Sequence, residues 1–216
     1  MSSLTEKQKA DAALHAEYER NTDRLNAIIR PLRTAQYEVD HEWSRITTAL
    51  QTYGEDYGML DMNPDFQRGH VWTPDQQQHF IENVLRGVIS TAGFLVQFNC
   101  PNWEMADDGY QGDLPRGVQC IDGLQRITAV QDFLDGKVRP FGLGVDDLKS
   151  SSFSIKSGRF RFRLAMHNFK MRAELLQHYL DLNAGGTPHG ASEIDRVRGL
   201  LLEAKKGARI SSGMSC

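Results

Sequence analysis

A strand-to-helix turn is encoded by residues 118–126, which read Val-Gln-Cys-Ile-Asp-Gly-Leu-Gln-Arg. The apolar start predicts a short buried strand, and Gly123 permits a tight turn after it. Ile127, Val130 and Phe133 then recur at helical spacing. The first amides of such a helix lack partners within it and lie at the positive end of its dipole. The turn is therefore suited to binding a phosphate group.

Three side chains of this turn are candidates for chemistry. Arg126, in the first helical turn, can make a bidentate contact with a phosphate. Asp122 can cap the helix, orient a water molecule or hold a metal ion, and Gln125 can contact a ligand or position a nucleophile. The structural alternative is a simple cap in which Arg126 pairs with Asp122, and the turn by itself does not exclude it.

Two further segments are rich in polar side chains beside predicted helices. Residues 63–72 read Asn-Pro-Asp-Phe-Gln-Arg-Gly-His-Val-Trp and precede a capped helix start at Thr73-Pro74. In this segment Arg68 is a second candidate phosphate ligand, or an arginine stacked on Trp72. Residues 182–188 read Leu-Asn-Ala-Gly-Gly-Thr-Pro, where Asn183 ends a helix that the glycines terminate, or simply joins two helices.

Outside these segments, some stretches have the hydrophobic spacing of a strand and others have that of a helix. We expect strands at residues 37–40, 60–64, 93–98 and 153–164, and helices at 43–50, from 74 to a close at Gly87, at 170–182 and from about 192 to 206. A capping box at Ser3 to Glu6 predicts a further, largely exposed N-terminal helix that ends before Pro31. Gly54 and Gly58 are expected to break the chain. The pattern predicts an α/β (α+β) domain at residues 37–206, an N-terminal helical extension at 1–36 and a flexible tail at 207–216.

The charge of the chain is unevenly distributed. The net charge is −3, yet residues 151–216 carry eleven Lys and Arg against five Asp and Glu. Arg159, Arg161 and Arg163 alternate with apolar residues in the predicted strand, so they share its outer face. A basic face can contact a polyanion such as DNA, and the alternative is a solvated surface.

Several classes of protein lack support in the sequence. There is no apolar run of about 18 residues for a membrane span, and the first residues do not resemble a signal peptide. The cytoplasm is therefore the expected compartment. The three cysteines and seven scattered histidines show no metal-ligand spacing, so no metal site is predicted from them. A P-loop, a nucleophile elbow and a zinc-protease motif are all missing.

The three segments, in their order, resemble the domain-of-unknown-function 262 family, the N-terminal module of GmrS-type and SspE-type restriction proteins. The family pattern is Pro-x-Tyr/Phe-Gln-Arg…Trp, then Asp-Gly-Gln-Gln-Arg, then Asn-x-x-Gly-x-Pro-Leu-x-x-x-Glu. The residues that match it are Pro64, Phe66, Gln67, Arg68, Trp72, Asp122, Gly123, Gln125, Arg126, Asn183, Gly186, Pro188 and Glu193. The Gly-x-x-Arg-x-x-Ala spacing from Gly123 to Ala129 is similar to that of the wider ParB/sulfiredoxin superfamily. Leu124 stands where the family has Gln and where sulfiredoxin has its reactive Cys, so thiol chemistry at that position is excluded.

The resemblance implies a ParB/sulfiredoxin-like small mixed sheet with flanking helices and a C-terminal helical pair. It implies a module that binds and hydrolyses a nucleoside triphosphate with Mg²⁺ and that acts on or senses DNA, in phage defence or phage biology. We expect no nuclease domain in this chain. The nucleotide-binding residues would be Gln67, Arg68, Gly123, Arg126 and Asn183. The catalytic residues would be Asp122, Gln125, Arg126 and Arg68, and the contacts to nucleic acid would come from Arg159, Arg161 and Arg163.

Two other interpretations of the same residues stay open. The chain can be a non-enzymatic interaction protein, a subunit or inhibitor of a restriction or modification complex, with a partner or a second copy bound through its N-terminal helix. It can also be an enzyme that modifies DNA or nucleotides and uses the same pocket. Nucleotide turnover distinguishes the first of these from the NTPase interpretation.

Overall fold

The computed structural model describes residues 5–67, 69, 71–90, 93–104, 109–156, 158–184 and 191–213, with the side chains of residues 191 and 208–213 left aside. The chain divides into two units, Met1–Arg33 and Thr34–Cys216. The first unit contains one long helix, and the second contains a mixed sheet with helices on both of its faces. None of the described helices is long and apolar enough to cross a membrane.

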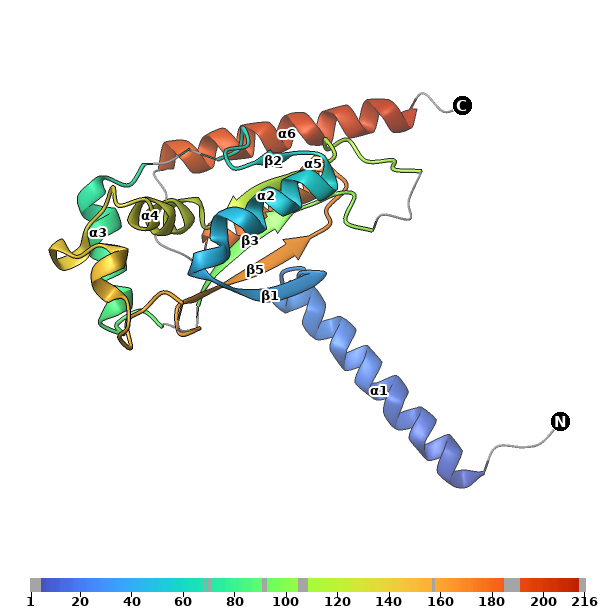
Figure 1. Ribbon diagram of the computed structural model, residues 1–216. Coiled ribbons are helices and arrows are strands. Elements are labelled where there is room, and N and C mark those ends of the chain that lie inside the picture. Colours follow the sequence, from blue (N-terminus) through green and yellow to red (C-terminus); the bar gives the residue numbers. More distant parts are fainter. Residues whose placement is uncertain are drawn as a thin grey trace. The chain divides into compact units, whose positions relative to one another are not determined.

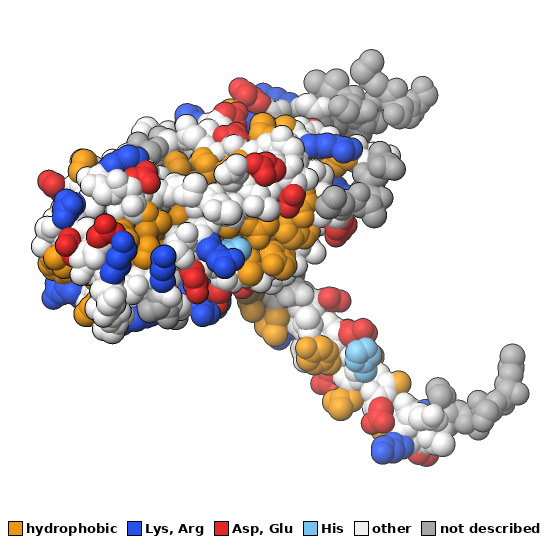
Figure 2. All heavy atoms as spheres, in the orientation of Figure 1, with side chains coloured by type: hydrophobic (Ala, Val, Ile, Leu, Met, Phe, Trp, Pro, Cys, Tyr) orange, Lys and Arg blue, Asp and Glu red, His pale blue; other side chains and the backbone are white. Residues whose placement is uncertain are grey.

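The helix of the first unit is α1 (Glu6–Ile29). Its capping box is formed by Thr5 and Gln8, so the expected box from Ser3 to Glu6 is wrong: a glutamine satisfies the third helical position as well as a glutamate does. No residue of α1 is buried, and apolar side chains are spaced along its surface (Figure 2). The helix ends at Arg30, which adopts a left-handed conformation just before Pro31.

The sheet of the second unit has the strand order β1-β5-β3-β4-β2 (Figure 1). Two pairs, β1 with β5 and β3 with β4, are antiparallel, whereas β3 with β5 and β2 with β4 are parallel. This arrangement confirms the α/β (α+β) class and the mixed sheet. The strands are β1 (Tyr37–Glu42), β2 (Leu60–Asp61), β3 (Phe94–Asn99), β4 (Val118–Asp122) and β5 (Arg161–His167).

The expected helices are present, with bounds that differ from the expected ones by several residues in places. The second unit contains η1 (Trp43–Arg45), α2 (Ile46–Tyr57), α3 (Pro74–Leu85), α4 (Leu124–Leu134), η2 (Pro140–Gly142), η3 (Val145–Leu148), α5 (Arg172–Ala184) and α6 (Ala191–Gly213).

Three expectations about where elements begin or end are wrong. Helix α2 continues through Gly54, where a Cβ would lie 3.0 Å from the Cβ of Leu60, and ends instead at Gly58. Strand β5 begins at Arg161 rather than near residue 153, because Gly158 has a φ of +69° and interrupts the extended run. Helix α6 continues to Gly213, so most of the expected tail is helical.

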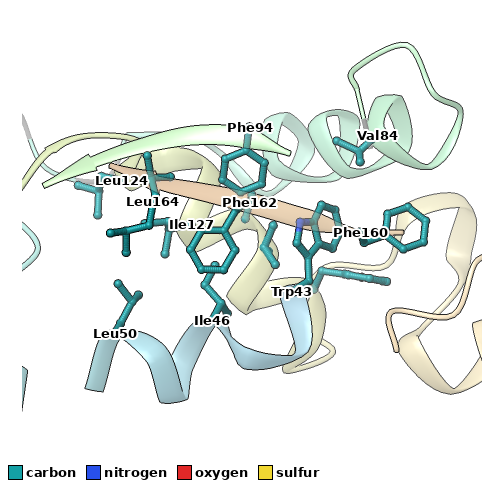
Figure 3. Packing of buried hydrophobic residues seen from close by; sticks show 14 of the residues in the cluster. Trp43, Ile46, Leu50, Val84, Phe94, Leu124, Ile127, Phe160, Phe162 and Leu164 are labelled. Carbon is teal, nitrogen blue, oxygen red and sulfur yellow. The ribbon is translucent and has the colours of Figure 1, made fainter. Parts of the chain in front are cut away.

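The larger apolar cluster lies on the face of the sheet that α2, α3 and α4 cover. Figure 3 shows Phe162 and Leu164 of β5 beside Ile46 and Leu50 of α2. Both strand residues are fully buried. The alternation expected for this strand, apolar inward and arginine outward, is therefore confirmed from Arg159 to Leu164.

A second, smaller apolar cluster lies on the opposite face. It joins Ile121 of β4 to α5 and α6, and it includes Phe66 from the loop between β2 and α3. Phe66 is fully buried and its ring contacts that of Tyr179 edge-on, with centroids 5.3 Å apart. The end of β4 therefore lies between the two clusters, next to the loop before α3.

Candidate functional site

The turn between β4 and α4 has the geometry that its sequence predicts. Gly123 adopts a φ of +105° and is the N-cap of α4. A Cβ at this position would lie 2.6 Å from Cγ1 of Val96 in β3, so glycine is required both by conformation and by space. Leu124 packs into the larger apolar cluster and is 8% exposed, so its side chain points away from any ligand at the turn.

The strand that leads into the turn is irregular at its last residues. The register between β3 and β4 shifts at Gln97 and Phe98, which oppose Asp122 and Cys120 respectively. Ile121 is thus the extra residue of a bulge. Bulges often occur next to functional sites, where they change the direction of the following side chain. Here the following side chain is Asp122.

Asp122 and Arg126 form an ion pair one helical turn apart. Both side chains remain accessible, with 41% of Asp122 and 30% of Arg126 exposed. The pair predicted as the structural alternative is thus present. It is also accessible to a phosphate, which would compete with the carboxylate for the guanidinium.

Gln125 holds the neighbouring loop in place. Its Oε1 accepts hydrogen bonds from the backbone N–H groups of Val71 and Trp72, both at 3.0 Å, and its Nε2 donates to the carbonyl of Gly69 at 2.7 Å. Both lone pairs of the oxygen and one of the two N–H groups are therefore used. These contacts give Gln125 a part in positioning the loop, and the catalytic role expected from the sequence stays a prediction.

Gln67 makes a matching connection in the other direction. Its Nε2 donates to the carbonyls of Cys120 and Ile121, both at 2.8 Å, and so fixes the loop to the end of β4. Together, the hydrogen bonds of Gln67 and Gln125 hold the backbone at Gly69, Val71 and Trp72 against the turn. Arg68 and His70 belong to this loop but lie outside the described residues, as do residues 185–190 with Gly186, Pro188 and His189.

Arg196 of α6 is a residue of this region that the sequence analysis missed. Its guanidinium donates to the carbonyls of Asp65, Phe66 and Gln67. Arg172 of α5 adds an ion pair with the Asp65 carboxylate at 2.6 Å. The loop is therefore held from two sides. No local sequence signal identifies Arg196, because its partners lie about 130 residues earlier in the chain.

The third predicted segment reaches the loop through packing rather than through a ligand contact. Asn183 donates to the carbonyl of Tyr179 at 2.7 Å, which keeps its amide within α5. The hydroxyl of Tyr179 donates to Glu193 of α6 at 3.2 Å, and its ring packs on Phe66. Asn183 is thus linked to the turn through Tyr179 and Phe66, and the described contacts do not bring it to Arg126.

Arg161 and Arg163 of β5 and Arg159 just before it are exposed, and acidic residues of β1 lie opposite the two in the strand. Arg163 lies opposite Asp40 and forms an ion pair with it at 3.1 Å, and Asp40 raises the pKa of this arginine. Arg161 lies opposite Glu42. Arg159 lies over the rings of Phe153 and Phe160. The strand therefore carries a charge-balanced pair with β1 rather than a uniformly basic surface.

Thiol chemistry has no support at this site. Cys120 is fully buried below the turn, and burial raises the pKa of its thiol far above neutrality. Burial likewise raises the pKa of Cys100 to about 12. Both thiols are protonated at neutral pH, so neither can act as a nucleophile. Among the described residues, no group of three His, Cys, Asp or Glu side chains is placed to hold a metal ion by itself.

Comparison with known proteins identifies the family. The family model of the N-terminal domain of the GmrSD restriction endonuclease matches residues 46–194. This range contains the turn, the loop before α3 and the end of α5, and it stops two residues before Arg196. Searches of curated proteins and of solved structures gave no significant match. The match covers more than half of the chain, which therefore belongs to the family of GmrSD restriction endonuclease N-terminal domains, a family of restriction systems.

Proposed function

We propose that this chain is a ParB-like module that binds a nucleoside triphosphate with Mg²⁺ at the β4–α4 turn, hydrolyses it, and thereby acts on or senses DNA in phage defence. One observation carries the proposal: an accessible Asp122–Arg126 pair stands at the N-terminus of a helix whose N-cap, Gly123, has no room for a side chain. The family match supports the restriction context.

The N-terminus of α4 supplies the phosphate site. The amides of its first turn have no acceptors within the helix, and Gly123 allows a phosphate to approach them closely. Arg126 adds a charged donor within the same turn. Arg68 would supply a second guanidinium from the loop that Gln67 and Gln125 hold against the turn.

Asp122 fits the requirements of Mg²⁺. This ion keeps several waters and is commonly bound by one or two carboxylates together with substrate phosphates. A single carboxylate beside a phosphate site therefore suffices, and a cluster of three protein ligands is not needed. When nucleotide binds, Arg126 would turn to the phosphate and Asp122 to the cation, so each loses its present partner and gains an equivalent one.

The test is nucleotide binding and turnover by the parent chain and by Arg126→Ala. We expect the substitution to weaken triphosphate binding about 10- to 100-fold, because hydrogen bonds to charged groups contribute about 1.5–3 kcal/mol. Isothermal titration with each of the four ribonucleoside triphosphates and Mg²⁺, and phosphate release with and without DNA, would measure it.

The control is Arg198→Ala, which removes an exposed helical ion pair with Asp195 elsewhere on the surface. It should bind and hydrolyse nucleotide as the parent does. If the parent binds no triphosphate, or if Arg126→Ala binds as tightly as the control with the fold intact, the proposed function is wrong.

A second candidate function rests on α1. Leu14, Tyr18 and Ile28 are each about two-thirds exposed. Apolar side chains arranged on an exposed helix commonly mark a protein–protein contact. In this case the chain would be an interaction subunit that binds a second copy or another protein through α1, with no nucleotide turnover.

Replacing Leu14 and Ile28 together with glutamate tests this candidate. If α1 joins two copies, light scattering should show a dimer for the parent and a monomer for the double variant. Both positions are exposed, so helicity should be unchanged. The control pair Lys9→Glu and Arg20→Glu changes charge on the same helix without removing apolar surface. Equal masses for the parent and both double variants would exclude self-association through α1.

A further inference from the structure

An apolar pocket lies between the end of α3 and the segment that follows α4. Its volume is about 350 Å³, and its lining includes Arg86, Phe141, Leu143, Leu148, Phe153 and Arg159. We call it the Phe141 pocket. Figure 1 shows α3 and the segment that carries η2 side by side at one end of the second unit, and the two elements are in contact.

We propose that the Phe141 pocket binds a single nucleotide unit, with the base against the two phenyl rings and the phosphate on the two arginines. The pocket shares no lining residue with the 122–126 turn. The inference therefore does not rest on the proposed triphosphate site, and either can be correct without the other.

The aromatic wall of the pocket is held in place by a fixed loop. Phe141 adopts a left-handed conformation with a φ of 53°, yet its ring is 54% exposed. Its backbone N–H donates to the carboxylate of Glu82 at 3.1 Å, and an ion pair between Arg139 and Asp147 closes the loop behind it. A non-glycine residue in this conformation costs free energy, and such residues concentrate at functional sites. The loop therefore presents a large apolar ring to solvent at a cost in stability.

The charge of the pocket favours an anion. Arg86 and Arg159 both line it, and none of the described lining residues is acidic. Neither arginine forms an ion pair with any of the residues described in the structure. The guanidinium of Arg159 lies over the rings of Phe153 and Phe160 at 5.5 and 5.6 Å, which fixes its position and leaves its N–H groups available at the edge.

Exposed aromatic rings beside unpaired arginines match the chemistry of a nucleotide. Any of the bases can stack on a phenyl ring, and a phosphate binds the paired N–H groups of a guanidinium. A volume of about 350 Å³ is at the lower end of the range for small-ligand pockets, which suits one nucleotide and not a duplex. The unit can be a free nucleotide or a nucleotide extruded from DNA, the substrate class of the family to which the chain belongs.

Photo-crosslinking tests the proposal. The probes are 5-iododeoxyuridine 5′-monophosphate, a single-stranded oligonucleotide that contains 5-iododeoxyuridine, and the 5-iododeoxyuridine nucleoside, which lacks the phosphate. After irradiation of the full chain, mass spectrometry maps the cross-linked peptides. We expect cross-links within residues 137–159 for the phosphate-bearing probes. Labelling by the oligonucleotide alone would assign the site to DNA, and labelling by the monophosphate alone would assign it to a free nucleotide.

Two variants test the ring and the arginine of the pocket one at a time. Phe141→Gly removes the ring and suits the left-handed backbone, so the melting temperature should not fall while cross-linking drops at least tenfold. Arg86→Gln should weaken the phosphate-bearing probes and leave the nucleoside unchanged. Arg45→Gln, an exposed arginine beside a different pocket, is the control.

Four results would overturn the proposal. The first is the absence of cross-links in residues 137–159 with either phosphate-bearing probe. The second is unchanged labelling in Phe141→Gly, and the third is equal labelling by the nucleoside and the monophosphate. Labelling that survives Arg126→Ala would show that the pocket and the turn act separately, whereas labelling that Arg126→Ala removes would also count against a separate site.

Discussion

Replacing Gly123 with alanine is expected to destabilise the fold by roughly 2–6 kcal/mol. About 1–3 kcal/mol comes from the left-handed backbone, which has a φ of +105°. A similar amount comes from overpacking, because the new Cβ would lie 2.6 Å from Cγ1 and 2.9 Å from Cβ of Val96. Valine is stiff at χ1 and its Cβ is fixed to the backbone of β3, so it cannot move away at little cost. Urea denaturation, with the midpoint and slope fitted together, would measure the loss.

Gly136 supplies the matched control at the other end of α4. Its φ is +76°, but nothing lies within 4 Å of a Cβ built there. Gly136→Ala should therefore show the conformational cost alone, about 1–3 kcal/mol. If Gly123→Ala is no more destabilising than Gly136→Ala, then α4 can move away from β3. The turn would then not be the rigid phosphate site that the proposed function requires.

The elements of this fold follow well from local sequence. Short apolar runs placed β3 and β4 within one residue of their observed bounds, and Thr73-Pro74 correctly marked the start of α3. These signals depend on residues that are close in the chain, so sequence spacing carries them. Gly54 was expected to break the chain, but it lies within α2 and leaves room for Leu60 to approach the helix. Local sequence does not indicate this role, because Leu60 lies outside the helix.

Pairings between distant residues could not be predicted. Nothing in the local pattern of residues 37–42 indicates that Asp40 lies opposite Arg163, and this register decides whether the β5 arginines form a basic surface. The role of Arg196 is hidden for the same reason. Its charge suggested a solvated helix face, yet it donates to three successive carbonyls of the loop before α3.

The role of Gln125 shows most directly that local sequence does not predict contacts between distant residues. The sequence places it one residue before Arg126 in a phosphate-binding turn, which favours contact with a ligand. Its three hydrogen bonds instead go to Gly69, Val71 and Trp72, which lie more than 50 residues earlier. The motif therefore did not indicate these contacts of Gln125 with the loop, and the expected role of this residue in catalysis stays a prediction.

Replacing Gln125 with leucine should release the loop while leaving Asp122, Gly123 and Arg126 of the turn unchanged. Three hydrogen bonds are lost, at about 0.5–1.5 kcal/mol each, so we expect a destabilisation of roughly 1.5–4.5 kcal/mol. Hydrogen exchange should show loss of protection at the amides of Val71 and Trp72, which donate to Gln125 in the parent. Gln131→Leu is the control, because this residue lies on the same helix and its described hydrogen bond, to Thr47, is long and therefore weak at 3.5 Å.

Kinetics then distinguish positioning from catalysis at the same residue. If Gln125 holds the loop that carries Arg68, its loss should raise the Kd for triphosphate, and saturating nucleotide should restore most of the turnover. If Gln125 acts on the attacking water, turnover at saturation should fall while the Kd stays the same. Unchanged protection of Val71 and Trp72 in Gln125→Leu would contradict the positioning role. The three hydrogen bonds that reach across more than 50 residues favour the first outcome, in which the two glutamines hold a binding loop and the accessible Asp122–Arg126 pair meets the ligand.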